Sequence, residues 1–527
     1  MRWLVVGLAV LVALPLVVFL VRIGGPAWGP FHVEGDMALI ELATRHAARG
    51  EQLLGPYSRF GFHHPGPAMF YLLAPLYAAS GGRFVSLLFT ALLANTVLLG
   101  AAAWTAWRAG RREALLPALL VLPLLALYIR PSYLCSVWNP NLAVVPFLAA
   151  LLAMAAVIAG RIAFLPLAVG AGSLALQCHL GFLLPLAAAG VLTAAARLVA
   201  PVRRWLGLDE RVVGRRWVGV AIAAGIAVAA WTPPVVEQLT GSPGNVTRVA
   251  EFLRRPSQPH GVVESIRAVA GASGAVLLAP AGARLGGPLP AVESAVAQAL
   301  GLAVALALPL ALLLARRERR PFATALAALG LAVVPAAVVV VRAISGDLHE
   351  YLLRWLAAVG ALGLVALGAG FAPVLARVAA RRRVVCLFGG VLVLGGGLAL
   401  AALNVRRVVE VVPLSRQAEG AVYRRVAAAV EACRTGIVAR GLREVELRID
   451  HRDAWGLAAG LVLHLEKAGT KVSVAPDLVR IYGPNHAPRA PGAVLVVEPP
   501  GRAASGGEVV FADERVTLRL VAPVPQV

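Results

Sequence analysis

Long uncharged apolar segments recur along the chain, separated by short clusters of arginine. Many are close to the roughly twenty residues that a helix needs to cross a hydrocarbon core about 30 Å thick. The ten-residue alternating strands of a membrane barrel are absent, so helices are the spanning elements, because each satisfies its own backbone polar groups in lipid. We predict eleven helices, near residues 3–21, 84–107, 114–129, 141–160, 162–177, 181–196, 217–236, 294–315, 321–341, 355–376 and 384–404.

Two of these helices come from one uncharged stretch, Ile162–Ala196. A single helix of that length would measure about 52 Å, which exceeds one membrane crossing. The only polar interruption is around Gln177 and His179, so we place a tight turn at Gln177–Gly181. With this division, every arginine cluster falls on the same side of the membrane, as the positive-inside rule requires.

The same rule fixes the orientation. The predicted inner loops hold the arginines of 108–112, 161, 197–216, 316–320 and 377–383, whereas short outer loops hold single arginines at 130, 342 and 354. The N-terminus is then cytoplasmic and the C-terminus is outside. The segment that follows the first apolar run, Arg22–Trp28, has no convincing small-x-small cleavage site, so we interpret that run as a retained helix.

Two outer segments are long, 22–83 and 237–293. The first contains an amphipathic stretch, Asp36–Arg49, and an apolar stretch, Pro67–Ala79, that is too short to cross. Both are predicted to be helices lying along the membrane surface. Before the second segment, Trp231-Thr-Pro-Pro is expected to end a helix, because proline cannot continue the hydrogen-bond ladder.

From about residue 405 the membrane-length apolar runs stop. Helices are predicted at Ser415–Cys433 and Ala454–Lys467, and strands at Glu444–Ile449, Lys471–Ala475, Ala493–Glu498 and Val509–Leu520. The predicted fold class is therefore an α-helical polytopic membrane module, 1–404, followed by a small α/β domain, 405–527, on the outer side. That domain carries no catalytic motif that we recognise.

Composition narrows the function further. The chain is 59% hydrophobic, with a mean hydropathy of +0.79, well above a soluble domain. A net charge of +22 would suit nucleic acid, but nearly all of it is arginine, much of it between apolar runs, so no nucleic-acid partner is expected. The excess of arginine, alanine and valine is typical of a GC-rich bacterium. The cysteines, Cys135, Cys178, Cys386 and Cys433, lack metal-like or disulfide spacing and are expected to pack.

Acidic residues are scarce, and Asp36 stands out by its position, because Glu34-Gly35-Asp36 opens the first amphipathic helix. One interpretation is a helix cap, and the other is a chemical role. The segment that follows gathers Arg59, His63 and His64 among turn and aromatic residues. It is either a rigid interface loop or a site for a sugar or phosphate, because arginine pairs with phosphate and aromatic rings stack on sugars.

Polar residues also mark the outer ends of other predicted helices. They are Arg130, Asn139, Asn141, Gln177, His179, Glu350 and Arg354. A single polar residue at a helix end is usually only solvated. On this topology, however, all of them converge at the outer boundary, where polar groups at membrane depth are functional candidates. We expect these residues, with Glu34, Arg59, His63 and His64, to bind substrate.

This arrangement resembles the GT-C superfamily of polytopic glycosyltransferases, which take a sugar from a polyprenyl-phosphate carrier at the outer face of the membrane. The resemblance rests on Gly35-Asp36, the two surface helices, the entry His64–Ala68 to the second of them, and the helical module followed by an outer domain. It implies that Asp36 is the general base and that the transfer inverts the anomeric carbon, with the lipid phosphate as leaving group. Cation candidates for that phosphate are Arg59, His63, Arg130 and Arg354.

The resemblance also implies the partners: a polyprenyl-phosphate sugar donor, a cell-envelope glycan or lipid acceptor, and the lipids of a bacterial plasma membrane. Some members hold a divalent metal between the first-loop acid and another acid in the next outer loop. Here that loop, Arg130–Asn141, has no carboxylate, which argues against metal dependence. Asn139 and Asn141 are instead expected to bind substrate hydroxyl groups.

Two other classes of membrane protein stay open as alternatives. A transporter or flippase should show internal repeats or interrupted helices with charges near the midplane. We find no repeat, and the charged residues lie at helix ends. A lipid-linked polysaccharide ligase or polymerase would centre its site on a late outer loop such as 237–293. The residues favour the glycosyltransferase.

Overall fold

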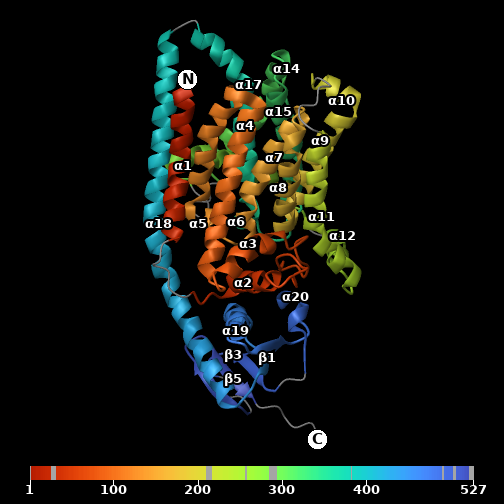
Figure 1. The fold of residues 1–527 in the computed structure, drawn as a ribbon, viewed down its shortest axis with the longest axis vertical. Coiled ribbons are helices and arrows are strands. Elements are labelled where there is room, and N and C mark those ends of the chain that lie inside the picture. The colour runs from red at the N-terminus through yellow and green to blue at the C-terminus, as the bar shows by residue number, and fades with distance from the viewer. Residues whose placement is uncertain are drawn as a thin grey trace.

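A bundle of upright helices carries a small α/β domain at one end, and two short helices lie between them (Figure 1). The computed structural model describes residues 2–24, 31–208, 216–255, 258–283, 293–380, 383–489, 492–501 and 506–521. Parts of three predicted loops, at 25–30, 209–215 and 284–292, lie outside the described residues. The predicted fold class, a helical polytopic membrane module followed by a small α/β domain, is confirmed.

The bundle contains most of the helices. In chain order they are α1 (Arg2–Gly24), α4 (Phe84–Ile129), α5 (Pro131–Leu134), α6 (Asn139–Leu142), α7 (Val144–Ile158), α8 (Leu165–Cys178), α9 (Leu183–Leu198), α10 (Ala200–Trp205), α11 (Arg216–Thr240), α12 (Asn245–Arg254), α13 (Val262–Gly274), α14 (Ala295–Arg317), α15 (Pro321–Arg342), α16 (Glu350–Leu353), α17 (Leu356–Ala380) and α18 (Arg383–Ala439).

Eight helical stretches of the described chain are long and apolar enough to cross a membrane. The prediction counted eleven helices, and the two counts differ for identifiable reasons. The element α4 joins two predicted helices, with a bend at Arg111 (φ 54°, ψ −148°). Ile162–Cys178 is apolar but shorter than the others, whereas α1 and the 384–404 part of α18 include side chains outside the described part of the chain, which the count of eight does not cover. One of the eight stretches, Val262–Ala281, was not predicted.

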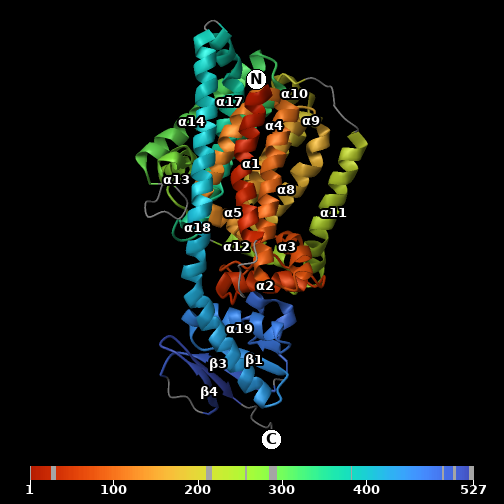
Figure 2. The ribbon, with the colours of Figure 1, turned by 60° about the vertical axis from the view of Figure 1, so that its left-hand side comes forward.

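That unpredicted stretch consists of α13 and a 3₁₀ segment, η3 (Ala275–Ala281), inside the predicted outer loop 237–293. It packs against α14, α15 and α17, as Figure 2 shows for α14. A search for uncharged runs misses it because Glu264 and Arg267 stand near its start. From Ala268 onward the residues are small and apolar, and most of them are buried.

The predicted break within Ile162–Ala196 is confirmed. The helix α8 ends at Cys178, His179 is extended (φ −155°, ψ 126°), and a 3₁₀ turn, η2 (Leu180–Phe182), leads into α9. The side chain of His179 accepts a hydrogen bond from the Gly181 backbone N–H, which stabilises this turn. Two helices therefore meet where the polar residues interrupt the apolar run.

The prediction that Pro233 and Pro234 end a helix is wrong, because α11 continues through both to Thr240. A proline in a helix leaves the carbonyl four residues earlier without its usual partner. For Pro234 that carbonyl belongs to Ala230, and the side-chain amide of Gln177 donates to it at 2.8 Å. A neighbouring helix thus supplies the missing donor, as is common for prolines in membrane helices.

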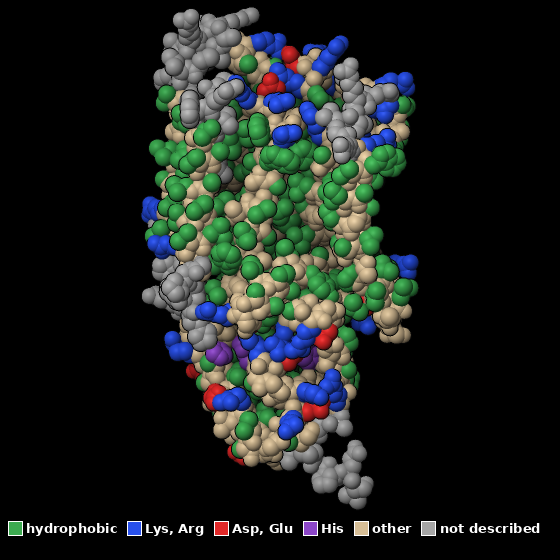
Figure 3. Space-filling model, viewed as in Figure 1, with side chains coloured by type: hydrophobic (Ala, Val, Ile, Leu, Met, Phe, Trp, Pro, Cys, Tyr) green, Lys and Arg blue, Asp and Glu red, His purple; other side chains and the backbone are tan. Residues whose placement is uncertain are grey.

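Arginine clusters from several helices meet at the end of the bundle away from the α/β domain (Figure 3). Arg320 pairs there with Glu113, and Arg377 pairs with Glu318 at 2.6 Å. Apolar side chains cover the middle of the bundle, and a second group of basic residues lies near the domain (Figure 3). This distribution is that of a membrane protein with two polar ends and an apolar belt.

The α/β domain begins without a break from the bundle, because α18 is one helix of 57 residues. The predicted boundary at 404/405 falls inside it. The sheet has the order β2-β1-β3-β5-β4 and consists of β1 (Glu444–Ile449), β2 (Lys471–Val474), β3 (Val494–Glu498), β4 (Glu508–Ala512) and β5 (Thr517–Val521). The first three strands are parallel, and β5 pairs antiparallel with both β3 and β4.

The helix α19 (Trp455–Lys467) packs on this sheet, and short α20 (Val479–Tyr482) and η5 (Pro484–His486) follow β2. One strand prediction is wrong: Val509–Leu520 forms a hairpin, not a single strand. The Asp513 side chain accepts hydrogen bonds from the backbone N–H groups of Arg515 and Val516, which closes the turn. Aspartate is a frequent turn residue for this reason.

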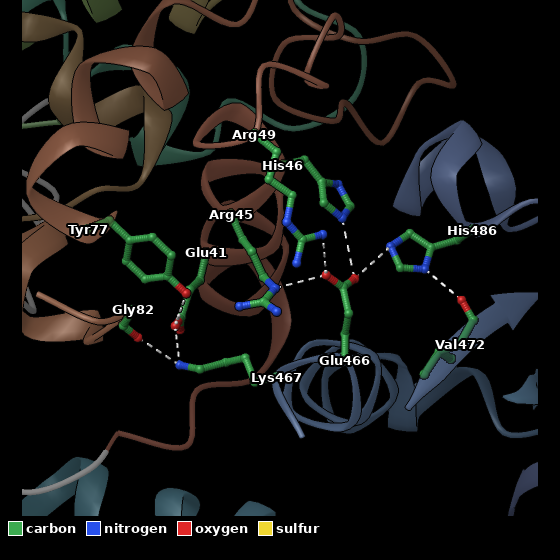
Figure 4. Close-up of polar contacts among 10 residues, drawn as sticks. All are labelled: Glu41, Arg45, His46, Arg49, Tyr77, Gly82, Glu466, Lys467, Val472 and His486. Carbon is green, nitrogen blue, oxygen red and sulfur yellow. Dashed lines mark hydrogen bonds and ion pairs between the residues drawn. The ribbon is translucent and has the colours of Figure 1, made fainter. Parts of the chain in front are cut away.

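Two helices lie across the end of the bundle, between it and the domain: α2 (Gly35–Ala47) and α3 (Ala68–Ala79), as predicted (Figure 1). The helix α2 packs directly on α19. An ion pair joins them: Lys467 lies 2.6 Å from the fully buried carboxylate of Glu41, which also accepts a hydrogen bond from the Tyr77 hydroxyl (Figure 4). Burial raises the pKa of Glu41, and Lys467 partly offsets that effect.

Candidate functional site

Asp36 is the second residue of α2 and does not cap that helix. The cap position is Glu34, whose side chain makes no capping hydrogen bond. Gly35 adopts φ +58°, and a β-carbon there would lie 3.5 Å from the ring of Trp455 in the α/β domain. The positive φ favours glycine at this position, and a β-carbon would only reach ordinary contact with that ring. The cap interpretation of Asp36 is therefore not supported.

The carboxylate of Asp36 instead accepts a hydrogen bond from the side chain of Trp138. Trp138 immediately precedes α6, in the next outer loop of the predicted topology. Surrounding protein raises the pKa of Asp36 above its ordinary value, and the hydrogen bond from Trp138 lowers it in part. Asp36 is nevertheless open to solvent from within a cavity, so a ligand can reach it.

The cavity at Asp36 has a volume of about 730 Å³, within the range of small-molecule sites. One part of its wall is apolar and includes residues from α9, α12 and α15. These are Leu183, Leu184, Phe252, Leu253, Val339 and Val340. Several of them are exposed on the outside of the bundle, for example Leu253 at 58% and Val339 at 55%. The cavity thus reaches from Asp36 to the apolar surface.

Three basic or imidazole side chains line the same cavity: Arg59, His64 and His179. Arg59 is exposed and stacks over Phe60 at 5.0 Å. His64 accepts the backbone N–H of Leu180 at its Nδ1, and the His64 and His179 rings lie 4.6 Å apart. Burial lowers the pKa of His64 well below its usual range. A neutral ring whose Nδ1 accepts carries its proton on Nε2, so His64 is a donor of hydrogen bonds without charge.

Two further cavities continue from this one towards the α/β domain. A pocket of about 70 Å³ shares Asp36, Tyr57 and Trp138 with the large cavity. A polar cavity of about 550 Å³ shares His63 and Gly483 with that pocket. Asp36 therefore lies between an apolar cavity that opens on the side of the bundle and a polar cavity between the outer loops and the α/β domain.

Comparison with known proteins gives one kind of match. No family model matches the sequence, and no curated protein matches it. Two crystal structures of ArnT from Cupriavidus metallidurans, one in the apo state and one bound to undecaprenyl phosphate, are similar in fold. Their TM-scores are 0.54 and 0.55 at 16% sequence identity, and the match covers 98% of this chain and 99% of theirs. The chain has the ArnT fold.

ArnT is a GT-C glycosyltransferase, so the GT-C resemblance of the sequence is confirmed at the level of the fold. The match includes the α/β domain, because it covers nearly the whole of both chains. At 16% identity it does not transfer individual residues, and the roles of the side chains must come from their geometry in this ArnT-like fold.

A second group of predicted residues lies beside the cavity and not in its wall. Arg354, 8% exposed, donates to Asn141 at 2.5 Å and to the Tyr133 hydroxyl at 3.2 Å, and it stacks over the rings of Tyr133 and Trp138. Glu350 lies 3.7 Å from Arg354. Arg130 lies over the Tyr133 ring at 5.7 Å. Through Arg354 this cluster contacts Trp138, the residue that lies beside Asp36.

The remaining predicted residues make structural contacts in this fold. Gln177 is fully buried and, besides its bond to Ala230, accepts the backbone N–H of Ala68 at 3.0 Å. Asn139 lines the cavity while its amide donates to the Cys178 carbonyl. Both ring nitrogens of His63 face carbonyl oxygens, those of Gly55 and Arg480, at 2.8 and 2.7 Å.

Glu34 lies against Gly456 of the α/β domain. It does not line the described cavity wall around Asp36. Glu34 is therefore close to Asp36 in the sequence but does not line the cavity that holds the Asp36 carboxylate.

Sequence reasoning missed two aromatic residues of the cavity, Trp138 and Trp455. Trp138 stands in the loop Arg130–Asn141, whose arginine and asparagines were the predicted site residues, and an indole N–H next to Asn139 was the available signal. Trp455 belongs to a domain without a recognisable motif. Its position against Gly35 follows from the packing of α19 on α2, which no local pattern reveals.

Proposed function

We propose that this protein is a membrane glycosyltransferase that moves a sugar from a polyprenyl-phosphate donor to an acceptor of the cell envelope. The observation that carries the proposal is the large cavity, whose apolar wall opens on the side of the bundle and whose inner end holds the Asp36 carboxylate. An ArnT-like fold supports it, because one of the matching ArnT structures binds undecaprenyl phosphate.

The donor would enter the apolar side of this cavity. Polyprenyl chains are hydrocarbon, and burying them against leucine and valine side chains is favourable by about 25 cal/mol per Å² of apolar surface. The phosphate would lie near Arg59, His64 and His179, which offer hydrogen-bond donors at the polar end. Arginine is well suited to this task because its planar guanidinium pairs with phosphate oxygens.

Asp36 would act as the general base. It takes the proton of the acceptor hydroxyl while the hydroxyl oxygen attacks the anomeric carbon, and the bond from that carbon to the phosphate oxygen breaks. Attack opposite the leaving group inverts the anomeric centre. The surrounding protein raises the pKa of Asp36, which increases its basicity when it is ionised.

Asp36 is the only carboxylate among the described residues that line the large cavity and its adjoining small pocket. Divalent cations such as Mg²⁺ and Ca²⁺ prefer several oxygen ligands. The described residues therefore do not fit a metal ion at Asp36, and no step is assigned to one.

The acceptor would reach Asp36 from the polar cavity beneath the α/β domain. That cavity is lined by charged and amide side chains of both modules, including Glu237, Arg248 and Arg480. Such groups suit the hydroxyl and ionic groups of a glycan or a lipid headgroup. The arginine-rich end of the bundle would face the cytoplasm by the positive-inside rule. The reaction would then take place on the outer side of a bacterial plasma membrane.

Deletion of the gene tests the proposed function. Mass spectrometry of the mutant cells should show one polyprenyl-phosphate sugar accumulating and the matching sugar missing from an envelope glycan or lipid. The wild-type gene should restore both. If neither the lipid-linked sugars nor the envelope sugars change, the glycosyltransferase proposal is wrong, and a change in the sidedness of an intact precursor would favour a flippase instead.

The variant Trp138→Phe tests the link between Trp138 and Asp36. Loss of the indole N–H removes the group that holds the pKa of Asp36 down, so that pKa should rise further. A general base works only when deprotonated, so activity falls as pH drops through its pKa. We expect the acid limb of the kcat/KM profile to move to higher pH, with activity recovering at alkaline pH. An unshifted profile would contradict the assigned contact.

A further inference from the structure

A cluster of two histidines and a glutamate lies at the junction of α2 with the α/β domain, and the proposed transfer reaction does not use it. His46 comes from the last turn of α2, Glu466 from α19, and His486 from η5 (Figure 4). Both histidines are buried, at 4% and 3% exposed. Their ring nitrogens and a carboxylate oxygen of Glu466 all lie within 4.8 Å of one another.

The hydrogen bond of His486 determines where its lone pair points. Its Nδ1 lies 2.8 Å from the carbonyl oxygen of Val472, so Nδ1 carries a proton and donates it. In the neutral ring, Nε2 then has a lone pair, and this atom is buried with no hydrogen-bond partner, 3.6 Å from the Glu466 Oε2. Two electron-rich atoms thus face each other in a buried site, which requires a positive species between them.

The distance of each histidine nitrogen from the shared Glu466 oxygen suits a metal ion. His46 Nε2 is 3.3 Å and His486 Nε2 is 3.6 Å from the same oxygen of Glu466. Tetrahedral zinc with bonds of about 2.0–2.2 Å separates its ligand atoms by roughly 3.3–3.6 Å. The carbonyl that orients His486 is also the usual partner of a metal-bound imidazole, because it fixes the tautomer and the direction of the ring.

The arginines of α2 occupy the other carboxylate oxygen. Arg45 lies 2.9 Å and Arg49 lies 3.6 Å from Glu466 Oε1, which leaves Oε2 directed at the two histidines. Ligating carboxylates are commonly held by such hydrogen bonds. His46 also lines the polar cavity of about 550 Å³, which gives an ion a route of entry.

We propose that His46, Glu466 and His486 bind one divalent transition-metal ion, with the properties of Zn²⁺, that joins α2 to the α/β domain. Two imidazoles and one carboxylate are a ligand set that zinc accepts, with water completing the coordination. Because His46 is 420 residues from Glu466 in the sequence and lies on the other module, the ion would fasten the domain to the helix that begins beside Asp36.

Zinc binding by the full-length protein tests this proposal. The protein would be purified in nanodiscs with a tag free of histidine, stripped with a chelator, dialysed against Zn²⁺ and analysed by mass spectrometry for metal. We expect about one zinc ion per wild-type chain, and loss of at least about 100-fold in zinc affinity for His486→Gln. The control His451→Gln changes a histidine of the same domain outside the cluster and should bind zinc as the wild type does.

A second readout covers the case in which His486→Gln does not fold. Cobalt in place of zinc gives strong visible absorption in a tetrahedral site, and His46→Gln, on the other module, should abolish that absorption. A wild-type protein without bound zinc, or zinc retained by both histidine variants, overturns the proposal. A wild-type protein without bound zinc would mean that a proton on the His486 Nε2, and not a metal ion, lies between that nitrogen and the Glu466 Oε2. Neither readout depends on the transfer reaction.

Discussion

Replacement of Asp36 by asparagine should reduce turnover by about 10²–10⁴, the usual contribution of a general base. Asparagine keeps the size and polarity of aspartate and can still accept the hydrogen bond from Trp138, but it cannot take a proton at neutral pH. Insertion and stability should therefore stay close to wild type. The assay is transfer by the purified protein in nanodiscs, with the lipid-linked sugar isolated from the deletion strain as donor.

The matched control is Glu34→Gln, two residues away. Glu34 lies against the α/β domain and outside the described cavity wall around Asp36, so this variant should lose far less activity. Near-normal turnover by Asp36→Asn would refute the mechanism. Asp347 and Glu350 would then be the next bases to test, since both carboxylates lie on the same outer side in the predicted topology.

The second large effect is expected on stability. Lys467→Met should leave the Glu41 carboxylate buried without its ion-pair partner, at a cost of about 3–5 kcal/mol. Urea unfolding in nanodiscs, followed by tryptophan fluorescence, would measure it. The deficit should shrink as pH falls. Burial raises the pKa of Glu41, so the folded protein takes up a proton there before the unfolded chain does, and the penalty is fully present only above the folded pKa.

The chain supplies its own control, because Lys471 is the only other lysine and its side chain is exposed. Lys471→Met should change stability by no more than about 0.5 kcal/mol. The double variant Glu41→Gln, Lys467→Met removes the unpaired charge and should recover most of the loss. Equal effects of the two lysine variants would show that the buried pair does not hold the junction.

The sequence predicted the parts of the fold that depend on local patterns. The helix α2 follows from amphipathic spacing, α3 from an apolar stretch too short to cross the membrane, and the break near His179 from polar residues in an apolar run. Predictions failed where a distant partner changes the outcome. The prolines of α11 do not end the helix because Gln177, more than fifty residues earlier, satisfies the freed carbonyl.

The candidate site divides in the same way. Asp36 could be selected from the sequence because acidic residues are rare and its place beyond the first helix is unusual. Its environment could not be predicted, since Trp138 and Trp455 come from segments about 100 and 420 residues away. The prediction also grouped Arg354 with the phosphate ligands. Its guanidinium contacts Asn141 and aromatic rings, while its buried Nε has no hydrogen-bond partner, so its role towards phosphate stays a prediction.

The unbroken helix α18 has a mechanical consequence. With 57 residues it is about 85 Å long, so it extends well past any bilayer and enters the α/β domain with no loop between them. A domain attached in this way is less free to swing than one on a flexible linker. The tilt of α18 in the lipid, which responds to bilayer thickness, would act on the orientation of the domain. Thinner or thicker membranes would therefore move Trp455 relative to Asp36, and the lipid itself would set the width of the passage between them.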